Sequence, residues 1–268
     1  MLEIKDLNLK FTRNGFSKNL FNNLSLSVEK GEFICILGPS GCGKSSLLNI
    51  LAGFEKGYSG SVLLNNEKIS KPDIKRAIVF QDYALFPWLN VIENVSFGLK
   101  KKIPSRSERF LHATRYLELV DLVDNSRSRI HEISGGMQQR VAIARALAVQ
   151  PEILLLDEPL GALDDWSRRN LQSELIKIWT ELNQTILFVT HSVDEALLLA
   201  SRIVVMNVNS EKVLDLKIEA EHPRKLDHAE SIKIRGMIKD ALSQRLKNHS
   251  INSLNSSLEV DSAFDPGI

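Results

Sequence analysis

Cysteine is almost absent from this 268-residue sequence, which contains only Cys35 and Cys42. Two cysteines with six residues between them fit neither a disulfide framework nor a zinc site. We therefore expect a protein of a reducing, cytosolic setting.

An excess of charge of one sign is absent as well. Lys and Arg total 34, Asp and Glu total 33, and the formal net charge is +1. This balance gives no sign of the basic surface that binds nucleic acid or an anionic membrane. We expect no nucleic-acid partner.

Long apolar runs are also missing. The densest ones, residues 153–156 and 186–189, are far shorter than the about 20 residues needed to cross a bilayer. The N-terminus alternates apolar and polar residues like a strand and lacks the apolar core of a signal peptide. Any association with a membrane is then expected to depend on a partner protein.

What is present is an ordinary globular composition, with 43% apolar and 25% charged residues. Alternating residues from Met1 to about Val28 predict strands, broken by turns at Asn14-Gly15 and Asn22-Asn23. Three continuous apolar runs are each followed by a segment of helical spacing, which predicts an α/β fold with a buried parallel sheet and crossover helices. These runs are residues 33–37, 153–156 and 185–189.

The period changes at about residues 86–150, where no buried-strand pattern occurs and residues 107–122 have helical spacing. We expect a helical insertion there. Residues 202–216 predict a final hairpin. Beyond His222 the hydrophobicity falls, leaving one weak helix at 231–246 and a Ser- and Asn-rich end that is predicted to be disordered.

The clearest chemical signal is residues 38–45, GPSGCGKS, which fit the pattern G-x-x-x-x-G-K-[ST] between a predicted strand and a predicted helix. Glycines let backbone N–H groups converge on phosphate oxygens, and a helix N-terminus favours an anion. Lys44 can bridge the β- and γ-phosphates of a nucleotide, and the Ser45 hydroxyl can bind Mg²⁺. The alternative is an incidental glycine-rich turn, which the flanking strand and helix disfavour.

Two carboxylates, Asp157 and Glu158, directly follow the apolar run at 153–156. Ligands of a parallel sheet bind at the carboxyl ends of its strands, so both acids are expected at the phosphate site. Asp157 would hold Mg²⁺ directly or through water, and Glu158 could polarise an attacking water. Alone, such a pair is more often an ordinary solvated turn, but beside a phosphate loop it indicates catalysis.

A second anion site is predicted at Ser134-Gly135-Gly136, just before a helical run over residues 141–149. Ser is a preferred N-cap, and the glycines leave the first N–H groups of the helix uncovered. A simple capped helix start is the alternative. Two phosphate-receptive helix starts in one chain are explained if a nucleotide binds between two copies.

Gln81 and His191 each follow an apolar run, so they too are predicted at the ligand edge of the sheet, where they could sense a γ-phosphate. For a single residue of either type, a structural or solvated role is the alternative. Their common placement at the ligand edge favours a functional role.

The ordered set of GPSGCGKS, Gln81, ISGGMQQR, ILLLDEP, GALD at 161–164 and His191 resembles the ATP-binding subunit of an ABC transporter. The resemblance covers about residues 1–216. Residues 79–88 and 187–191, with His222-Pro223-Arg224, are most similar to the branch that imports nitrate, sulfonate and taurine.

The resemblance implies a P-loop NTPase core with a parallel sheet, an N-terminal antiparallel β subdomain and a helical subdomain inserted at about residues 86–150. The nucleotide-binding domain would span residues 1–220 and a C-terminal extension residues 221–268. The implied function is ATP hydrolysis, with Mg²⁺, that energises import of nitrate, sulfonate, taurine or a similar small anion.

The implied partners are a second copy of the chain or a paralogous ATPase subunit, integral-membrane permease subunits and, indirectly, an extracytoplasmic solute-binding protein. The implied location is the cytoplasmic face of the inner cell membrane, as a peripheral subunit. Two competing functions are a non-transport ABC ATPase acting on nucleic acid or ribosomes, and a regulatory subunit that binds nucleotide without hydrolysing it. The neutral charge and single cassette disfavour the first, and the intact Glu158 and His191 disfavour the second.

Roles for single residues also follow from the resemblance. Glu158 would be the general base, His191 would contact the γ-phosphate, and Gln81 would touch Mg²⁺ and the attacking water. Asp157 and Ser45 would support the metal, and Lys44 would act on the phosphates.

The remaining implied contacts belong to the nucleotide and to the opposite subunit. The triphosphate would be held by Gly38, Pro39, Ser40, Gly41, Cys42, Gly43, Lys44, Ser45 and Ser46. The site of the opposite subunit would be completed by Ser134, Gly135, Gly136 and Gln138. Asp164 would belong to a loop that couples the two sites, and Phe11 would stack on adenine, with Phe16 as a rival.

The sequence departs from the usual family pattern at four positions: Ser46, Ile133, Gly161 and Ser192. Ser192 begins a capping-box pattern with Glu195, so we expect that change to be benign. Gly161 could loosen the coupling loop.

Two further features leave alternatives open. Cys42, at a helix N-terminus, is either a redox-active thiolate or, as we expect, a small loop filler whose alkylation would block ATP binding. The apolar residues 83–89 either belong to the core of the helical subdomain or form a groove for a permease helix.

Overall fold

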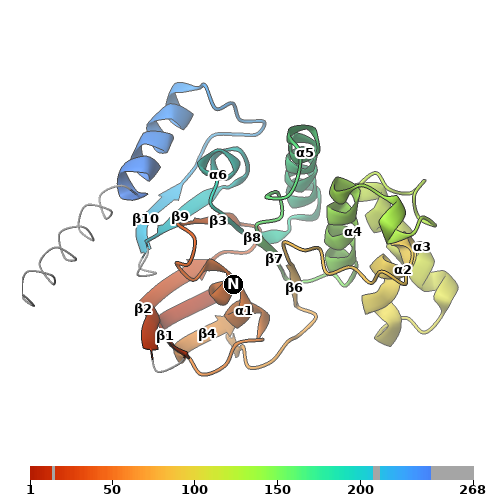
Figure 1. Ribbon diagram of the computed structural model, residues 1–268, viewed down its shortest axis with the longest axis horizontal. Coiled ribbons are helices and arrows are strands. Elements are labelled where there is room, and N and C mark those ends of the chain that lie inside the picture. Colours follow the sequence, from red (N-terminus) through yellow and green to blue (C-terminus); the bar gives the residue numbers. More distant parts are fainter. Residues whose placement is uncertain (14–15, 208–211, 243–268) are drawn as a thin grey trace, which may run out of the picture.

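The computed structural model describes residues 1–13, 16–207 and 212–242. Two β-sheets set its architecture, a four-stranded sheet of order β2-β1-β4-β5 and a six-stranded sheet of order β10-β9-β3-β8-β7-β6 (Figure 1). The first sheet contains β1 (Leu2–Arg13), β2 (Phe16–Val28), β4 (Ser59–Leu64) and β5 (Glu67–Lys68). The second contains β3 (Phe33–Leu37), β6 (Arg76–Val79), β7 (Ile153–Asp157), β8 (Thr185–Thr190), β9 (Arg202–Met206) and β10 (Lys212–Lys217).

The six-stranded sheet is parallel except for β10, which pairs antiparallel with β9. Every residue of β3 and β8 is buried, because helices cover both faces of a parallel sheet. Leu37 pairs with Thr190 and Asp157 with Val189, so β3, β7 and β8 end at the same level. The predicted parallel sheet is confirmed, and its carboxyl edge is where the predicted ligand residues lie.

Helix α1 (Lys44–Ala52) lies between the two sheets (Figure 1). One hydrophobic cluster joins Leu2 and Phe21 of the antiparallel sheet, Leu47 of α1 and Ile36 of the central sheet. On the opposite face of the central sheet, a second cluster joins Phe188 and its neighbours to the other helices. The parallel strands of the central sheet therefore contribute alternate side chains to two separate cores.

The predicted turn at Asn22-Asn23 is wrong, because β2 continues through both residues. Asn23 has a φ of +52°, and its backbone N–H donates to Asn8 Oδ1 at 3.0 Å while Asn8 Nδ2 donates to Asn23 Oδ1 at 3.0 Å. The register between β1 and β2 shifts here, so the two asparagines form an irregularity within the strand pair instead of a turn. The predicted turn at Asn14-Gly15 lies outside the described residues.

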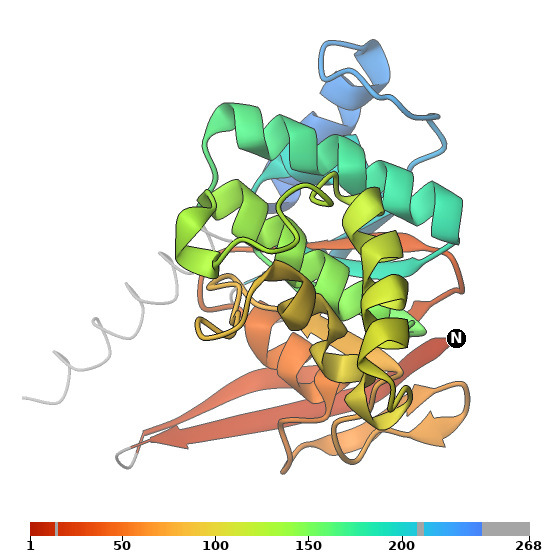
Figure 2. The ribbon, with the colours of Figure 1, turned by 90° about the vertical axis from the view of Figure 1, so that its right-hand side faces the viewer.

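Residues 86–150 contain helices and no named strand, as expected (Figure 2). These elements are α2 (Val91–Ser96), the 3₁₀ turn Phe97–Lys101, α3 (Arg106–Leu119), the 3₁₀ turn Ile130–Glu132 and α4 (Gly135–Ala148). The predicted helix at 107–122 ends earlier than expected, since the chain turns at Asp121 with a φ of +54°. Two further helices, α5 (Asp165–Leu182) and α6 (Val193–Leu199), follow β7 and β8.

The residues after β10 pack against α6 and the hairpin of β9 and β10 (Figure 1). The guanidinium of Arg224 donates to the carbonyl oxygens of Leu197, Ala200 and Ala220, near the C-terminal end of α6. Residues 229–242 are helical, and Arg235 of this helix pairs with Asp194 at 2.8 Å. The helix begins slightly before the predicted 231–246, and the end predicted to be disordered lies outside the described residues.

Arg202 ties the far edge of the central sheet together. Its Nε and Nη2 donate to both carboxylate oxygens of Asp215 at 2.7 and 2.8 Å, joining β9 to β10. Its Nη1 donates to the carbonyl of Ser27 at 2.9 Å, which connects this edge to β2. The hydrogen bonds from Arg202 lower the pKa of Asp215 from 3.8 to about 2.

We predict that Asp215→Asn lowers the free energy of unfolding by about 1 kcal/mol at pH 7, a value discounted for the partial exposure of the pair. Because the pKa of folded Asp215 is below that of the unfolded chain, this stability is present above pH 4 and is lost as the pH falls towards 2. Urea unfolding at pH 7 and pH 3 should show the difference from the unsubstituted protein shrinking. The exposed Asp240→Asn serves as the control, and a gap that stays constant with pH would contradict the assignment.

Candidate functional site

The loop at residues 38–43 is shaped by its glycines. A Cβ on Gly38 would lie 2.6 Å from Cys42 Sγ and 2.8 Å from the carbonyl oxygen of Met206, so no side chain fits there. Gly41 and Gly43 have φ angles of +78° and +96°, which favour glycine. These constraints explain why a loop between β3 and α1 with this backbone requires glycine at three positions.

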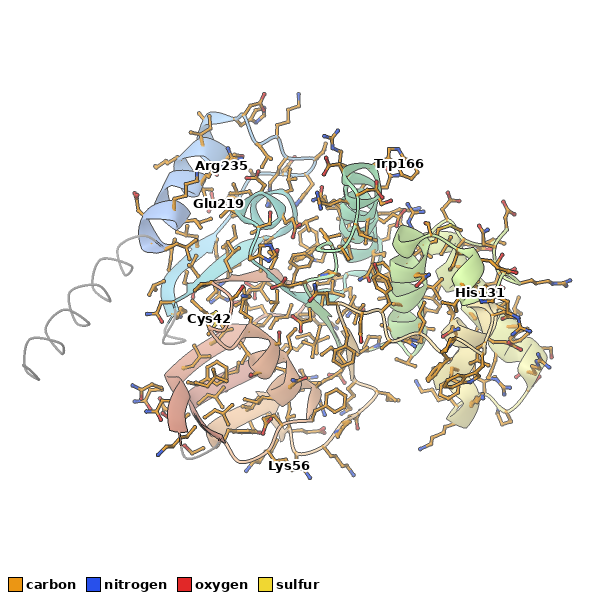
Figure 3. The ribbon with its side chains drawn as sticks, viewed as in Figure 1. Cys42, Lys56, His131, Trp166, Glu219 and Arg235 are labelled. Carbon is orange, nitrogen blue, oxygen red and sulfur yellow. The ribbon has the colours of Figure 1, made fainter. Side chains whose placement is uncertain are left out.

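The Cys42 side chain is fully buried beneath this loop, in the cluster with the antiparallel sheet (Figure 3). It is not part of a disulfide. Its Sγ occupies the space that a side chain on Gly38 would need. The geometry agrees with the loop-filler interpretation and gives no exposed thiol for redox chemistry.

Lys44 begins α1 and is 5% exposed. Its Nζ donates to the carbonyl oxygens of Gly38 and Pro39 at 2.9 and 3.1 Å, and lies 4.0 Å from Glu158 Oε1. Two carbonyl groups of the loop therefore fix the position of the ammonium group above it. Ser40 on the same loop is exposed and Ser46 is half-buried in the first turn of α1.

Ser45 and Asp157 meet across the gap between α1 and β7. The hydroxyl of Ser45 donates to Asp157 Oδ1 at 3.2 Å. Burial raises the pKa of Asp157, and the bond from Ser45 and the charge of Lys44 oppose that rise. A hydroxyl and a carboxylate are oxygen ligands of the kind that Mg²⁺ takes.

No group of three or more His, Cys, Asp and Glu side chains in the described ranges is arranged to hold a metal ion. A cation at Ser45 and Asp157 would therefore need further oxygen ligands from outside this set. Mg²⁺ usually takes these from substrate phosphates and water.

Glu158 and His191 form a pair at the ends of β7 and β8. His191 Nδ1 lies 3.0 Å from Glu158 Oε2, and the His191 side chain is 61% exposed while that of Glu158 is 22% exposed. Glu158 has a φ of +45°, an uncommon conformation for a residue with a side chain, and its N–H donates to the carbonyl of Val189 at 3.0 Å. The backbone of Glu158 is thus fixed to β8 directly beside the segment that carries His191.

Gln81 follows β6, and its side chain reaches the loop after β7 near Gly161. A Cβ on Gly161 would lie 3.7 Å from Gln81 Nε2 and 3.5 Å from the carbonyl oxygen of Glu158. Both are ordinary van der Waals distances, so the loop after β7 would accommodate a small side chain at Gly161, one of the departures from the family pattern. Arg145 of α4 fixes the chain after Gln81 by donating to the carbonyls of Tyr83 and Ala84 at 3.0 and 2.7 Å.

Ser134 and its neighbours form a second group of predicted site residues, at the N-terminus of α4. Ser134 caps the helix, with its Oγ accepting from the N–H of Met137 at 3.3 Å. Gln138 donates from Nε2 to the carbonyls of Ile130 and Ile133 at 3.1 and 3.2 Å, so its amide holds the turn before the helix. A Cβ on Gly135 would lie 3.5 Å from the hydroxyl oxygen of Tyr83.

This second group of site residues also contacts the start of α5. A Cβ on Gly136 would lie 3.0 Å from Ser167 Oγ, and a cavity of about 200 Å³ is lined by Ser134, Gly136, Trp166 and Ser167 among others. Asp164 caps α5 by accepting from the N–H groups of Trp166 and Ser167 at 3.0 Å each, and these bonds lower its pKa. Trp166 projects from the start of α5 and is 73% exposed (Figure 3).

The predicted site residues thus fall into two groups. The loop at 38–46, Gln81, Asp157, Glu158 and His191 meet at the carboxyl edge of the central sheet. The contacts of Ser134, Gly135, Gly136 and Asp164 are instead with Tyr83, Met137 and α5. Phe11 lies in β1, and its side chain, like that of Phe16, lies outside the described residues.

Comparison with known proteins identifies the family. Residues 21–161 match the family model described as ABC transporter. The chain belongs to the ABC transporter family. This membership and the predicted fold class are confirmed by the solved structures to which the chain is similar.

Curated relatives are similar over most of the chain. An uncharacterized ABC transporter ATP-binding protein of Methanocaldococcus jannaschii is 42% identical over 251 residues, which is 92% of this chain and 94% of that protein. The taurine import ATP-binding protein TauB of Ruegeria pomeroyi is 46% identical over 206 residues, 76% of this chain and 77% of that protein. The nitrate import ATP-binding protein NrtD of Synechocystis sp. is 42% identical over 228 residues, 83% of this chain and 86% of that protein.

Among solved structures, a dimeric bacterial ABC transporter cassette superposes with a TM-score of 0.74 at 32% identity, covering 82% of this chain and all of that one. A post-hydrolysis dimer of the same cassette, bound to ADP and Pi, gives a TM-score of 0.73 at 32% identity and covers 82% of this chain. Across the described residues, none of the helices has the length and apolar character to span a membrane.

Sequence reasoning missed several residues that shape the site. Arg145, Arg168 and Glu195 bond to the loops that carry Gln81, Glu158 and His191. Their partners are backbone carbonyls or side chains brought close by folding, so spacing in the sequence carries no signal of them. The capping-box pattern at Ser192 was a partial signal, since it singled out Glu195.

We predict that Gly38→Ala destabilises the protein by about 1–3 kcal/mol, because the added Cβ would clash with Cys42 Sγ and the backbone of Met206. The control is Gly236→Ala in the C-terminal helix, where a Cβ meets nothing within 4 Å. There alanine should leave the stability unchanged or raise it by up to about 1 kcal/mol. Urea unfolding measures both, and equal stability of the two variants would show that the loop is not packed in this way.

Proposed function

We propose that this chain is the ATP-hydrolysing subunit of an ABC importer. The observation that carries the proposal is the assembly of Lys44, the Ser45–Asp157 contact and the Glu158–His191 pair at one edge of a parallel sheet. These groups supply a cation for phosphates, oxygen ligands for a metal, and a carboxylate to accept a proton. Such a combination suits phosphoryl transfer to water.

ATP is the proposed substrate of the loop that follows β3. The N–H groups of residues Gly38 to Ser46 would contact the phosphates, and Lys44 would exchange its bonds to the loop carbonyls for the β- and γ-phosphate oxygens. Ser45, Asp157 and Gln81 would hold Mg²⁺. The ion would neutralise charge on the phosphates as the bond to the leaving group breaks.

In the proposed reaction, Glu158 accepts a proton from a water that attacks the γ-phosphorus in line with the leaving oxygen of ADP. His191 holds the Glu158 carboxylate through Oε2 and reaches the γ-phosphate with the other side of its ring. Because little covalent chemistry is left to the protein, most of the rate effect comes from positioning and electrostatics. Glu158 must therefore be held firmly, which its hydrogen bond to β8 provides.

We further propose that each ATP binds between two copies of the chain. Ser134, Gly135, Gly136 and Gln138 of one copy would cover the nucleotide held by the phosphate loop of the other. Two features support this arrangement: the two groups of site residues are separate within one chain, and the similar solved cassettes are dimers. Asp164 would connect the two sites, Phe11 would stack on adenine, and a paralogous subunit could replace the second copy.

The proposed contact with permease subunits is an aromatic surface of the helical region. Trp88 is 68% exposed, and Phe86 packs against both Trp88 and Phe97, with ring centroids 5.6 and 4.4 Å apart. Arg145 lies over the Phe86 ring while bonding the carbonyls that follow Gln81. Movement of Gln81 at the γ-phosphate would therefore reach this surface through a short chain of contacts.

The proposed physiological setting follows from the relatives. Names that refer to taurine and nitrate import support a small anion as the solute. The subunit would lie on the cytoplasmic face of the membrane, bound to the permease and acting only indirectly with a solute-binding protein. Residues 1–220 would form the nucleotide-binding domain, with its helical subdomain at 86–150, and residues 221–268 an extension.

We predict that Glu158→Gln lowers ATP turnover about 10²–10⁴-fold, because the variant loses its general base. ATP should still bind, and size-exclusion chromatography with light scattering should show an ATP-dependent dimer that persists. Glu181→Gln, on the exposed end of α5, is the control and should turn over ATP normally. Normal hydrolysis by Glu158→Gln would refute the assignment of the general base.

We predict that Trp88→Ala reduces co-purification with the permease subunits and lowers solute uptake, because it removes the most exposed ring of the aromatic surface. Leu111→Ala is a matched control, since Leu111 of α3 is an apolar side chain of similar exposure, at 65%, and is not one of the three rings of this surface. Both variants should show cooperative thermal unfolding. Equal loss of uptake in the two variants would place the permease contact elsewhere.

A further inference from the structure

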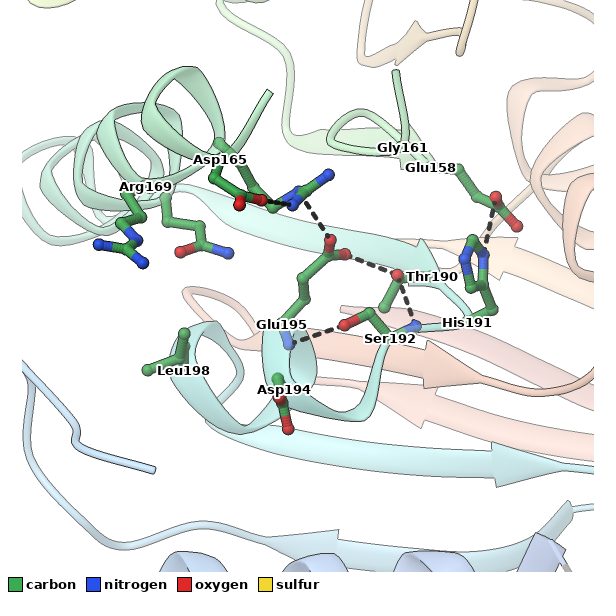
Figure 4. A pocket seen from close by; sticks show the side chains of 12 residues that line it. Glu158, Gly161, Asp165, Arg169, Thr190, His191, Ser192, Asp194, Glu195 and Leu198 are labelled. Carbon is green, nitrogen blue, oxygen red and sulfur yellow. Dashed lines mark hydrogen bonds and ion pairs between the residues drawn. The ribbon is translucent and has the colours of Figure 1, made fainter. Parts of the chain in front are cut away.

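The helices that follow Glu158 and His191 are joined by an ion pair between Arg168 of α5 and Glu195 of α6 (Figure 4). Arg168 Nε lies 4.0 Å from Glu195 Oε1, and the side chains are 32% and 10% exposed. The pair borders a cleft of about 440 Å³ that Glu158 and His191 also line. Neither residue has a role in the function proposed above.

Glu195 fixes the loop on which His191 lies. Its Oε2 accepts from the Thr190 hydroxyl at 2.6 Å, and Thr190 Oγ1 in turn accepts from the N–H of Ser192 at 3.0 Å. The N–H of Glu195 donates to Ser192 Oγ at 3.3 Å. The residues on both sides of His191 are therefore tied to Glu195 (Figure 4).

This arrangement corrects the expected capping box at Ser192. The cap bond from Glu195 N–H to Ser192 is present, but the Glu195 carboxylate bonds Thr190 and faces Arg168. In a reciprocal capping box, the Glu195 carboxylate would instead accept a hydrogen bond from the N–H of Ser192 at the start of α6. Here it is buried, which raises the pKa of Glu195, while Thr190 and Arg168 favour the charged form.

Arg168 fixes the loop that follows Glu158. Its Nη2 donates to the carbonyl of Leu163 at 2.7 Å, and its Nη1 donates to Asp165 Oδ1 at 2.7 Å. The same guanidinium therefore contacts the segment between Glu158 and α5 and the carboxylate that holds the His191 loop. A planar guanidinium with donors on several sides suits such a junction, and lysine would not reproduce it.

We propose that Arg168 and Glu195 are positioning residues that set the placement of His191 against Glu158. This inference rests on the proposed ATPase function, since it concerns the geometry of the same dyad. The Nδ1–Oε2 distance of 3.0 Å depends on two chain segments that leave neighbouring strands. Their backbones are joined by the bond from the N–H of Glu158 to the carbonyl of Val189, and the ion pair adds a side-chain link between the helices that follow them. Small displacements of a catalytic group cost far more in turnover than in substrate binding.

The test is steady-state ATP hydrolysis by Arg168→Gln, Glu195→Gln and the double variant. Glutamine at 195 keeps an acceptor for Thr190 and removes only the charge that faces Arg168. Each single variant should lower kcat about tenfold with KM for ATP within about twofold of normal, and the double variant should fall no further than the worse single one. Arg169→Gln is the control: its guanidinium makes no hydrogen bond or ion pair within the described chain, and its kcat should be normal.

Three results would overturn the inference. Losses that multiply in the double variant would show that the residues act independently, a change confined to KM would indicate ground-state binding, and an unchanged kcat would show no positioning role. Thermal unfolding shows whether each variant is folded. If the glutamine variants fold poorly, Arg168→Lys replaces them in the test, and because it keeps the charge but not all of the guanidinium's contacts, its kcat should be intermediate. The unsubstituted protein distinguishes a failure of this inference from a failure of the proposed function, because absence of ATP hydrolysis by that protein would refute the proposed function itself.

Discussion

The parallel pairing of β3, β7 and β8 is the constraint on which the rest of the molecule depends. Because Leu37 aligns with Thr190 and Asp157 with Val189, the strands end together, and their loops emerge at one edge of the sheet. Lys44, Glu158 and His191 come from distant parts of the sequence and meet there. The strands are buried on both faces, so this edge is held by rigid elements, as a precise site requires.

Helix α5 connects this edge to the second group of site residues. At its start, Ser167 contacts the glycine turn of α4, and further along Glu174 pairs with Arg140 of α4 at 2.8 Å. On its other side, Arg168 reaches the carboxylate of Glu195. A change in the position of α5 would therefore alter contacts both at the N-terminus of α4 and beside His191.

The C-terminal residues Arg224 and Arg235 hold α6 at its two ends, which stiffens the element that follows His191.

Much of this site could be predicted from the sequence because local patterns determine it. The phosphate loop, the carboxylates at the end of β7 and the Ser134 cap are each set by a few consecutive residues, and each lies where its pattern indicated. The turn expected at Asn22-Asn23 failed because pairing between β1 and β2 overrides local turn preference, with Asn8 bonding Asn23 across the strands. Glu195 could be found as a cap partner, but its carboxylate bonds Thr190, and only the folded chain brings Arg168 to it.

The central claim is that two copies of this chain enclose a magnesium-bound ATP between the phosphate loop of one and the α4 N-terminus of the other. The most direct measurement is a structure of the Glu158→Gln protein with ATP and Mg²⁺. The account predicts two nucleotides at the dimer interface, each with its γ-phosphate contacted by Lys44 of one copy and Ser134 of the other. A nucleotide bound to the phosphate loop with Ser134 of both copies facing away from it would contradict the account.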